Sequence, residues 1–501
     1  MVNTNNEAFF DHFKHTGLTY DDVTLVTQYA DFLPADTDLT ANLTRRVSLN
    51  VPFVSAAMDT VTESSMAIAM ALNGGIGIIH KNMDPVTQRT HVKRVKFYLN
   101  GFLKKARTMG PTDTVEDLYR ARDEKGWSFH SFPILDADRK LLGMVTRREL
   151  KYCDNPATPL REIMIPDLMT APVGTTIDQA YAFMKKHKIS ILPVVDENGI
   201  LDGMYCYSDV EDILKGHHPL YNRDDQHQLR CGAAVSPNGY DRVGCLMEAR
   251  LDVVVIDTAH GHTKGVIEMV RWIKKNYPAV DVVAGNVAAA EGAKALVEAG
   301  ADGIKVGVGP GSICTTRVVA GVGIPQITAI YECARVAAQA DVPVIADGGI
   351  RHSGDVAKAI AAGAGSVMMG RTLAATDEGP GERVLFQGRQ YVTYRGMGSL
   401  SAMTQRFGSA DRYGQAGVAA EKMVPEGVEG MVPYAGSVNE VLDQYIGGLR
   451  QSLGYNGCRT IPELQERARF KRITAAGVRE SHPHDVTLTK DAPNYKASDM
   501  R

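Results

Sequence analysis

Eight short apolar segments alternate with helical patterns along most of this 501-residue chain, and this alternation limits the fold more than any other feature. Near-continuous apolar strands separated by helices are typical of a parallel sheet covered by helices. Eight such units can close the sheet on itself, so we expect an α/β fold, a (β/α)8 TIM barrel. The predicted strands are Val51–Ala56, Ile76–Ile79, Cys231–Val235, Val253–Asp257, Val282–Asn286, Gly303–Val306, Val342–Asp347 and Ser366–Met369.

A duplicated segment interrupts this alternation after the second helical pattern. Phe132–Asp136 recurs as Leu192–Asp196, and Gly143-Met144 recurs as Gly203-Met204, at a constant offset of 60 residues. A repeat of this length is a duplicated supersecondary unit. We therefore predict a first barrel part at residues 1–100, an inserted tandem module at 101–216, and a second barrel part at 217–501.

Composition and charge exclude several classes of protein. The formal net charge of −3 gives no support for a nucleic-acid or membrane surface. No apolar run reaches membrane-spanning length, and the first ten residues are too polar for a signal peptide. The seven cysteines include no C-x-x-C pair, which favours free thiols, a reducing compartment and no zinc site. We expect a cytoplasmic protein.

A glycine-rich loop, Gly307–Arg317, follows the predicted strand Gly303–Val306. Its alternating glycines let backbone amides approach an anion, and Ser312 adds a hydroxyl donor. Cys314 then lies beside a phosphate-sized pocket, followed by two threonines and an arginine. A cysteine thiolate near positive charge or amide dipoles is typically nucleophilic, so we interpret Cys314 as a nucleophile rather than as a small buried residue in a turn.

Other polar residues collect where the predicted strands end. In TIM barrels the active site lies at the carboxyl ends of the strands, and phosphate is often held after the seventh and eighth. The seventh strand ends in Ala346–Gly349 and the eighth in Met369–Arg371, with Asp347 placed for a ribose diol. The fourth strand ends at Asp257 and the fifth at Asn286. This pattern predicts a substrate that carries a ribose phosphate.

Several motifs of the chain together resemble those of the inosine-5′-monophosphate (IMP) dehydrogenase family. They span nearly the whole sequence, at Leu18–Val23, Met58–Val61, Gly307–Arg317, Asp347–Gly349, Tyr394–Ser399, Asp411–Tyr413 and Val424–Gly427. The duplicated insert is similar to the pair of CBS modules that this family carries between the same barrel elements.

The resemblance implies oxidation of IMP to xanthosine monophosphate (XMP) with NAD as hydride acceptor, the committed step of guanine nucleotide synthesis. Cys314 would attack C2 of the purine, hydride would depart, and water would hydrolyse the resulting thioimidate. Covalent catalysis of this kind divides one difficult reaction into two easier steps. The residues that the resemblance assigns to the substrate are Ser312, Asp347, Gly348, Gly349, Gly370, Arg371, Tyr394, Gly396, Met397, Gly398 and Glu426.

The dinucleotide has no Rossmann module in this chain. No G-x-G-x-x-G opens a helix after a strand, and the glycine spacing at Gly307–Gly311 is wrong for that motif. The cofactor must therefore lie in a groove of the barrel face beside the nucleotide. The resemblance assigns it to Asp257, Asn286, Gly307 and Gly309.

Residues 385–434 are rich in Gly, Ser, Arg and Tyr and poor in helical periodicity, as a disordered surface loop would be. In the family this stretch includes a mobile flap that replaces the departed NADH and delivers water. Arg412, with Tyr413 beside it, would then be the base for hydrolysis, and Thr316 with Glu426 would offer a second proton route. An arginine base is unusual because the pKa of its guanidinium is so high.

The resemblance also implies a monovalent cation, usually K⁺, and a homotetramer, with an octamer of stacked tetramers left open. The cation ligands would be backbone carbonyls of Gly309, Gly311 and Cys314, together with Glu480, Ser481 and His482 of a neighbouring subunit.

Three positions depart from the family pattern. The CBS pattern usually ends Gly-x-x-Thr-x-x-Asp, but Cys206 replaces the Thr of the second module and Glu149 the Asp of the first. Purine nucleotide effectors are expected at this pair, and these departures leave ATP or GTP undecided. Arg371 stands where a small residue is common, which alters the expected phosphate contact.

Two other functions are weighed against the dehydrogenase. GMP reductase shares the barrel and the Cys314 loop, but lacks the Arg-Tyr flap of Arg412 and Tyr413. A catalytically idle nucleotide sensor would use only the CBS pair, and the presence of Cys314, Thr316 and Arg412 argues against it.

Overall fold

The computed structural model of this chain describes residues 4–98, 101–104, 106–124, 131–216 and 218–495, which fall into two compact units. The barrel unit comprises Met1–Lys96, Leu220–Asn222 and Arg230–Arg501. The inserted unit comprises Phe97–Pro219 and Arg223–Leu229. Separate clusters of buried apolar side chains form the cores of the two units.

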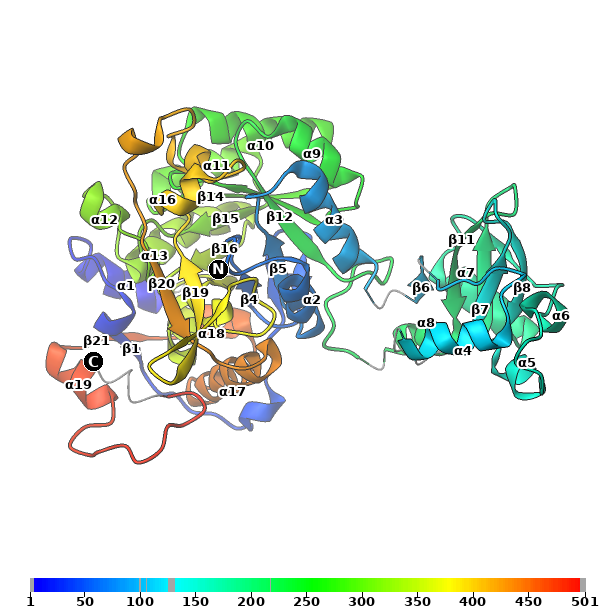
Figure 1. Cartoon of the computed structure of the whole chain (residues 1–501). Coiled ribbons are helices and arrows are strands. Elements are labelled where there is room, and N and C mark those ends of the chain that lie inside the picture. Colours follow the sequence, from blue (N-terminus) through cyan, green and yellow to red (C-terminus); the bar gives the residue numbers. More distant parts are fainter. Residues whose placement is uncertain (1–3, 99–100, 105, 125–130, 217, 496–501) are drawn as a thin grey trace. The chain divides into compact units, whose positions relative to one another are not determined.

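Eight parallel strands close into a barrel in the first unit, which confirms the predicted TIM barrel (Figure 1). Their order around the barrel is β12-β13-β14-β15-β16-β17-β4-β5, and β5 pairs with β12 to close it. The strand bounds differ from the predicted ones by one or two residues at a few ends. The strands are β4 (Phe53–Ser55), β5 (Ile76–Ile79), β12 (Cys231–Val235), β13 (Val253–Asp257), β14 (Asp281–Val287), β15 (Gly303–Val306), β16 (Val344–Asp347) and β17 (Ser366–Met369).

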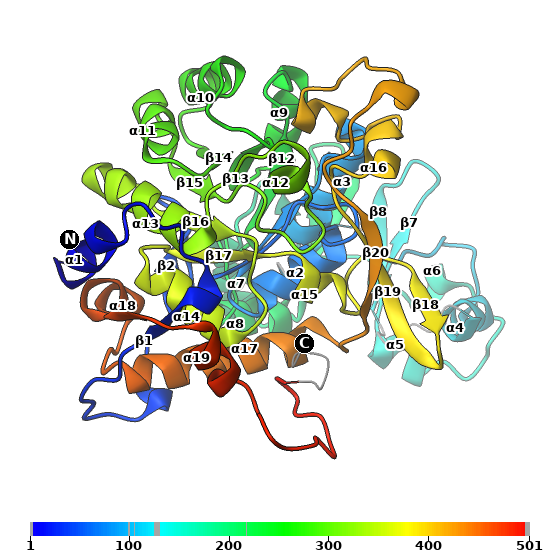
Figure 2. The ribbon, with the colours of Figure 1, turned by 90° about the vertical axis from the view of Figure 1, so that its left-hand side faces the viewer.

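Helices surround the barrel strands (Figure 2). In α10, Val266, Met269, Val270 and Ile273 are buried, a spacing that places one apolar side of the helix against the sheet. Thr263 caps this helix by accepting a hydrogen bond from the amide of Val266. The barrel helices are α2 (Ser64–Leu72), α3 (Pro85–Lys96), α9 (Tyr240–Met247), α10 (Lys264–Asn276), α11 (Ala290–Ala299), α13 (Gln326–Ala337), α14 (Ser353–Ala361) and α15 (Arg371–Ala374).

A short hairpin, β2 (Ala41–Asn42) and β3 (Ser48–Leu49), lies at the amino ends of the strands. Its Leu43, Val47 and Leu49 belong to the same buried cluster as Val253 and other inward-facing strand residues. The barrel interior is thus packed with side chains at this end, as is typical of TIM barrels, whose active sites lie at the carboxyl ends of the strands.

The inserted unit repeats one arrangement twice, a helix, an antiparallel pair of strands and a second helix. Glu149 accepts a hydrogen bond from the amide of Thr146, 3.0 Å away, so it caps α5. The first copy contains α4 (Val115–Glu124), β7 (Phe132–Leu135), β8 (Leu141–Val145) and α5 (Arg147–Lys151). The second contains α7 (Ile177–His187), β10 (Ile191–Val195), β11 (Leu201–Cys206) and α8 (Tyr207–Leu214). Further elements of the unit are β6 (Phe102–Leu103), α6 (Leu160–Ile163) and β9 (Ala171–Pro172).

The stretch after the eighth barrel strand contains a three-stranded antiparallel sheet that the sequence pattern did not predict. Its strands are β18 (Arg383–Phe386), β19 (Arg389–Arg395) and β20 (Glu429–Pro433). Between β19 and β20 lies a segment, residues 396–428, that we call the flap. It contains α16 (Leu400–Thr404) and the short 3-10 helices η4 (Ala410–Tyr413) and η5 (Ala420–Lys422).

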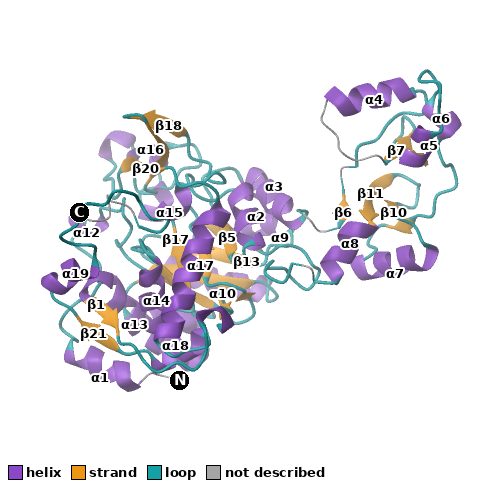
Figure 3. Cartoon of the chain, turned by 90° about the horizontal axis from the view of Figure 1, so that it is seen from below, coloured by secondary structure: helices purple, strands orange, loops and turns teal. Residues whose placement is uncertain are grey.

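Segments near the two ends of the chain pair beside the barrel, where β1 (Val23–Leu25) and β21 (Phe470–Arg472) lie side by side (Figure 3). The other elements of these terminal segments are α1 (Thr4–His12), η1 (Tyr20–Asp22), η2 (Pro34–Asp36), α17 (Val438–Tyr455), α18 (Ile461–Arg467) and α19 (Ala475–Ser481). The short 3-10 helix η3 (Ala338–Ala340) follows α13 directly. Within the described residues, no helix combines the length and apolar character needed to cross a bilayer.

Candidate active site

A cavity of about 370 Å³ lies at the carboxyl ends of the barrel strands. Loops after β15, β16 and β17 line it, together with residues of the flap. Nineteen of the 23 residues singled out from the sequence line this cavity: Asp257, Asn286, Gly307, Gly309, Gly311, Ser312, Cys314, Thr316, Asp347, Gly348, Gly349, Gly370, Arg371, Tyr394, Gly396, Met397, Arg412, Tyr413 and Glu426. Gly398, Glu480, Ser481 and His482 are the others.

The Cys314 loop is held to the flap through the backbone. The amide of Thr315 donates to the carbonyl of Glu426, 2.9 Å away, and the amide of Val428 donates to that of Ile313, 3.0 Å away. Cys314 Sγ lies 3.1 Å from Thr316 Oγ1, at the start of α12 (Thr316–Val319). The thiol therefore lies inside the cavity, between a loop of the barrel and the flap.

Two glycines are required where the loops after β15 and β16 meet. Gly307 has φ of 149°, and a Cβ there would lie 2.1 Å from the carbonyl oxygen of Asp347. Gly348 has φ of 96°, and a Cβ there would lie 2.9 Å from Pro310. Side chains at these positions would separate the two loops, so glycine is what lets Asp347 lie beside the Cys314 loop.

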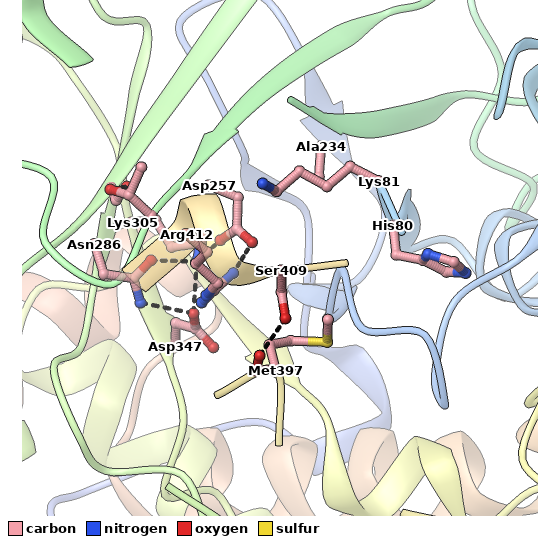
Figure 4. Close-up of polar contacts among 12 residues, drawn as sticks. His80, Lys81, Ala234, Asp257, Asn286, Lys305, Asp347, Met397, Ser409 and Arg412 are labelled. Carbon is pink, nitrogen blue, oxygen red and sulfur yellow. Dashed lines mark hydrogen bonds and ion pairs between the residues drawn. The ribbon is translucent and has the colours of Figure 1, made fainter. Parts of the chain in front are cut away.

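A buried network of charged groups forms the floor of the cavity (Figure 4). Lys305 Nζ lies 2.9 Å from Asp257 Oδ1 and 2.7 Å from Asp347 Oδ2, and it also donates to Asn286 Oδ1. Asn286 Nδ2 donates to Asp347 Oδ2 at 2.9 Å. Four strands thus contribute one polar side chain each, from β13, β14, β15 and β16. The network fixes the orientation of both carboxylates.

Sequence reasoning missed Lys305, although it left a signal. Within the apolar strand Gly303–Val306, Lys305 is the only charged residue, and its side chain is 1% exposed. A lysine is seldom buried unless it is paired. A lysine in a predicted buried strand, one residue from its carboxyl end, therefore points to a carboxylate partner inside the barrel.

The flap places Arg412 over this network. The Arg412 guanidinium forms an ion pair with Asp257, and the arginine side chain is 14% exposed. The Arg412 carbonyl accepts a hydrogen bond of 3.0 Å from the amide of Ala259. Tyr413 packs on the flap backbone, because a Cβ at Gly398 would lie 2.8 Å from its ring. Burial raises the pKa of the Tyr413 hydroxyl above its usual value.

The part of the cavity beside the carboxyl end of β17 is lined by glycines and tyrosines. A Cβ at Gly370 would lie 2.8 Å from Tyr394 Oη, so the hydroxyl lies directly over the end of β17. Burial raises the pKa of Tyr394 well above its usual value, and the phenol therefore stays neutral. Tyr20, which the sequence reasoning did not single out, lines the same end; its buried hydroxyl has no hydrogen-bond partner among the described residues. Hydroxyl donors and backbone amides suit a phosphate group.

The three carboxyl-terminal residues that the resemblance assigns to the cation do not line the cavity. Glu480 and Ser481 end α19, and His482 Nδ1 lies 2.7 Å from Tyr495 Oη. Gly309, Gly311 and Cys314 all line the cavity.

A family model described as the IMP dehydrogenase / GMP reductase domain matches residues 17–484. The chain belongs to the IMP dehydrogenase/GMP reductase family. It is therefore an oxidoreductase, and the resemblance noted from the motifs is confirmed.

Relatives named inosine-5′-monophosphate dehydrogenase are similar to nearly the whole chain. The protein from Aquifex aeolicus (strain VF5) is 51% identical over 484 residues, 96% of this chain and 97% of the relative. The protein from Bacillus subtilis (strain 168) is 48% identical over 491 residues, 97% of this chain and 99% of the relative. Among solved structures, a cysteine-to-alanine variant of GMP reductase from Trypanosoma brucei, in complex with guanosine 5′-monophosphate, is 39% identical with a TM-score of 0.81, covering 94% of this chain and 98% of that chain.

Proposed function

We propose that this chain oxidises IMP to XMP with NAD, through a covalent intermediate on Cys314. The observation that carries the proposal is the ion pair between Arg412 and Asp257, which lies in the same cavity as the Cys314 thiol. GMP reductase releases ammonia and consumes no water, so it needs no residue that activates water. IMP dehydrogenase needs such a residue, because water must hydrolyse the covalent intermediate after hydride has left. Relatives of similar length and about 50% identity carry the dehydrogenase name.

In the first step the Cys314 sulfur bonds to C2 of the purine, and a hydride leaves C2. NAD, when bound, supplies the hydride acceptor. In the second step water adds to C2, the C–S bond breaks, and the thiol is restored as XMP leaves. The sum is IMP, NAD⁺ and water giving XMP, NADH and a proton, so atoms and electrons balance.

Substrate binding follows from the polarity of the cavity. Asp347, held by Lys305 and Asn286, is an oriented acceptor for two ribose hydroxyls. The phosphate fits the glycine and tyrosine end, where Tyr20 also offers an unpaired hydroxyl. The proposed phosphate groups are Ser312, Gly348, Gly349, Gly370, Arg371 and Tyr394, and the proposed purine groups are Gly396, Met397, Gly398 and Glu426.

The second step is assigned to the flap. Arg412, with Tyr413 beside it, would orient and deprotonate water, and both residues line the same cavity as the Cys314 thiol. Thr316 and Glu426 would supply the second proton route. Thr316 fits this role because its hydroxyl lies 3.1 Å from the Cys314 sulfur.

The residues also fit NAD and a monovalent cation, in different degrees. The Asp257 carboxylate and Asn286 amide suit a ribose of the dinucleotide, with Gly307 and Gly309 beside them. Because the Arg412 guanidinium is paired with the Asp257 carboxylate here, the dinucleotide could not bind that carboxylate while the flap is docked. The carbonyls of Gly309, Gly311 and Cys314 are K⁺-type ligands and would order the loop. Since Glu480, Ser481 and His482 lie elsewhere in the chain, the set would be completed by a second subunit in a homotetramer.

Regulation is assigned to the inserted unit, as a CBS pair that binds purine nucleotides. Every described residue that lines the cavity belongs to the barrel unit. Joining Gly101 to Lys215 by a short linker should therefore keep most of the turnover, and its loss with the barrel still folded would contradict this assignment.

Two experiments test the reaction itself. Purified protein should form NADH from IMP and NAD, and should show no comparable oxidation of NADPH with GMP. In Arg412→Ala, rapid mixing with IMP and NAD should give a near-normal burst of NADH and a steady state slowed by about 10²–10⁴, the usual cost of losing a general base. A burst slowed as much as the steady state would assign Arg412 to binding or hydride transfer.

A further inference from the structure

Asp411, the residue before Arg412, is held by two barrel residues that the proposed reaction does not use. Lys81 follows β5 and Ser236 follows β12, so both lie at the carboxyl ends of neighbouring strands. Lys81 Nζ lies 2.5 Å from Asp411 Oδ1, 2.6 Å from Oδ2 and 2.7 Å from Ser236 Oγ. The Ser236 hydroxyl donates to the same carboxylate. Asp411 therefore has a fixed partner on each of two strands.

The position of Lys81 is unusual for a structural ion pair. Its side chain is 6% exposed, and its carboxylate partner belongs to the flap rather than to the barrel. Figure 4 shows Lys81 extended toward the flap, while the side chain of the preceding His80 points away. Arg242 of the outer helix α9, another cation near Asp411, is engaged by Gln88 Oε1 at 2.7 Å and the Met83 carbonyl at 2.8 Å.

We propose that Lys81 and Ser236 form a latch for the flap: by holding Asp411 they position Arg412 on Asp257 for hydrolysis. The inference rests on the proposed role of Arg412. Asp411 and Arg412 are consecutive residues of η4, so fixing one side chain to the barrel limits where the other can lie. Lys81 is a positioning residue, since its contact is with Asp411 and not with the reacting atoms.

Energetics favour a latch over a permanent contact. When the flap leaves, Lys81 loses the Asp411 carboxylate, whose charge and hydrogen bonds support the lysine charge against burial. Docking of the flap restores that partner. A charge-assisted hydrogen bond is typically worth about 10- to 100-fold in an equilibrium. The contact can therefore shift the flap strongly toward the docked state without making its release impossible.

The test is rapid mixing of Lys81→Met, a neutral side chain of similar length, with IMP and NAD. We expect a near-normal NADH burst, a steady state slowed about 10- to 100-fold, and accumulation of the covalent intermediate on Cys314. Lys81→Arg should recover part of the steady-state rate. Lys81→Met combined with Asp411→Asn should be no slower than either variant alone. Lys274→Met, which removes a lysine paired at 2.7 Å with Asp302, just before the amino end of β15, should change neither phase.

Hydrogen exchange gives a readout that does not depend on activity. In Lys81→Met, peptides within residues 405–424 should exchange faster, while barrel peptides keep the wild-type rate. Ser236→Ala, which buries no unpaired charge, should show the same change to a smaller extent and remains informative if Lys81→Met fails to fold.

Unchanged flap exchange and an unchanged steady state in both variants would overturn the latch. A slowed burst in Lys81→Met would also overturn it, because Lys81 would then act on hydride transfer or on binding. If Arg412→Ala itself slows the burst, the proposed function of Arg412 fails instead, and the exchange data alone decide whether Lys81 holds the flap.

Discussion

The ammonium group of Lys305 lies 2.7 Å from the carboxylate of Asp347, with the lysine side chain only 1% exposed. The same Nζ lies 2.9 Å from Asp257. One buried cation thus serves two carboxylates, the one proposed to bind the substrate ribose and the one that pairs with Arg412. Removing that cation would leave the two carboxylates close together without their shared counter-charge.

We predict that Lys305→Met destabilises the protein by about 3–5 kcal/mol, the usual cost of breaking a buried pair by removing one partner. The measurement is urea denaturation at pH 7. Lys264→Met is the matched control, because Lys264 is 87% exposed and pairs with Glu268 only at 3.7 Å. The control should change stability by less than about 0.5 kcal/mol. Equal effects of the two substitutions would mean that the buried network contributes nothing to stability.

Cys314 should be the one cysteine that carries the nucleotide. In Cys314→Ala, IMP should still bind, but no NADH should form even in a single turnover. Mass spectrometry of wild-type protein during turnover should find the adduct on the peptide that contains Cys314. Cys333 is an internal control, because it is fully buried and burial raises the pKa of its thiol. A nucleotide on Cys333 or Cys231 would refute the assignment.

Gly398 should matter through Tyr413. In Gly398→Ala the new methyl group would lie 2.8 Å from the tyrosine ring, so the ring must shift. A displacement near 1 Å at a catalytic group can cost about 10²-fold. At saturating IMP, where the proposed purine contact of Gly398 does not limit the rate, we expect that loss in the steady state rather than in the NADH burst. Gly430→Ala is the control, since a Cβ there meets no atom within 4 Å. The idea fails if the two variants behave alike.

Much of the fold and site could be predicted from the sequence because the signals were local. The strand Val253–Asp257 is a continuous apolar run that ends in a carboxylate, and both features survive in the structure as β13 and its cavity-facing end. The glycines around Cys314 likewise indicate a local backbone conformation that only glycine adopts easily. In each case the residues that carry the signal are adjacent in the chain.

The remaining features depend on contacts between distant segments. The pairing of β18, β19 and β20 joins residues 383 to 433. β18 is exposed along its whole length, and only two residues of β19 and one of β20 are buried, so buried apolar side chains mark these strands weakly. Lys81 and Asp411 are 330 positions apart. Considered alone in the sequence, neither residue can be distinguished from a solvated surface charge. Only the closed order of β5 beside β12 brings Lys81 and Ser236 together.

The latch should also have a defined dependence on pH. Burial opposes ionisation of Asp411, but the charge of Lys81 and hydrogen bonds from Lys81 and Ser236 outweigh it and hold the pKa of this carboxyl below its usual value near 3.8. The ionised form therefore favours the folded state. Its contribution should be complete above the unfolded-state pKa and should be lost as the pH falls through the lower folded-state pKa.

The comparison is Asp411→Asn against wild type in urea denaturation between pH 7 and pH 3. At pH 7 the substitution should lower the free energy of unfolding by about 1.5–3 kcal/mol, the range for hydrogen bonds to charged groups. The difference should stay constant down to about pH 5, since Asp411 remains ionised in both states above that value. Below pH 5 it should shrink, because protonation of Asp411 then removes the ion pair from the wild type, whereas the asparagine variant never had it. A difference that grows between pH 5 and pH 3 would show that protonated Asp411, not the ion pair with Lys81, stabilises the docked flap.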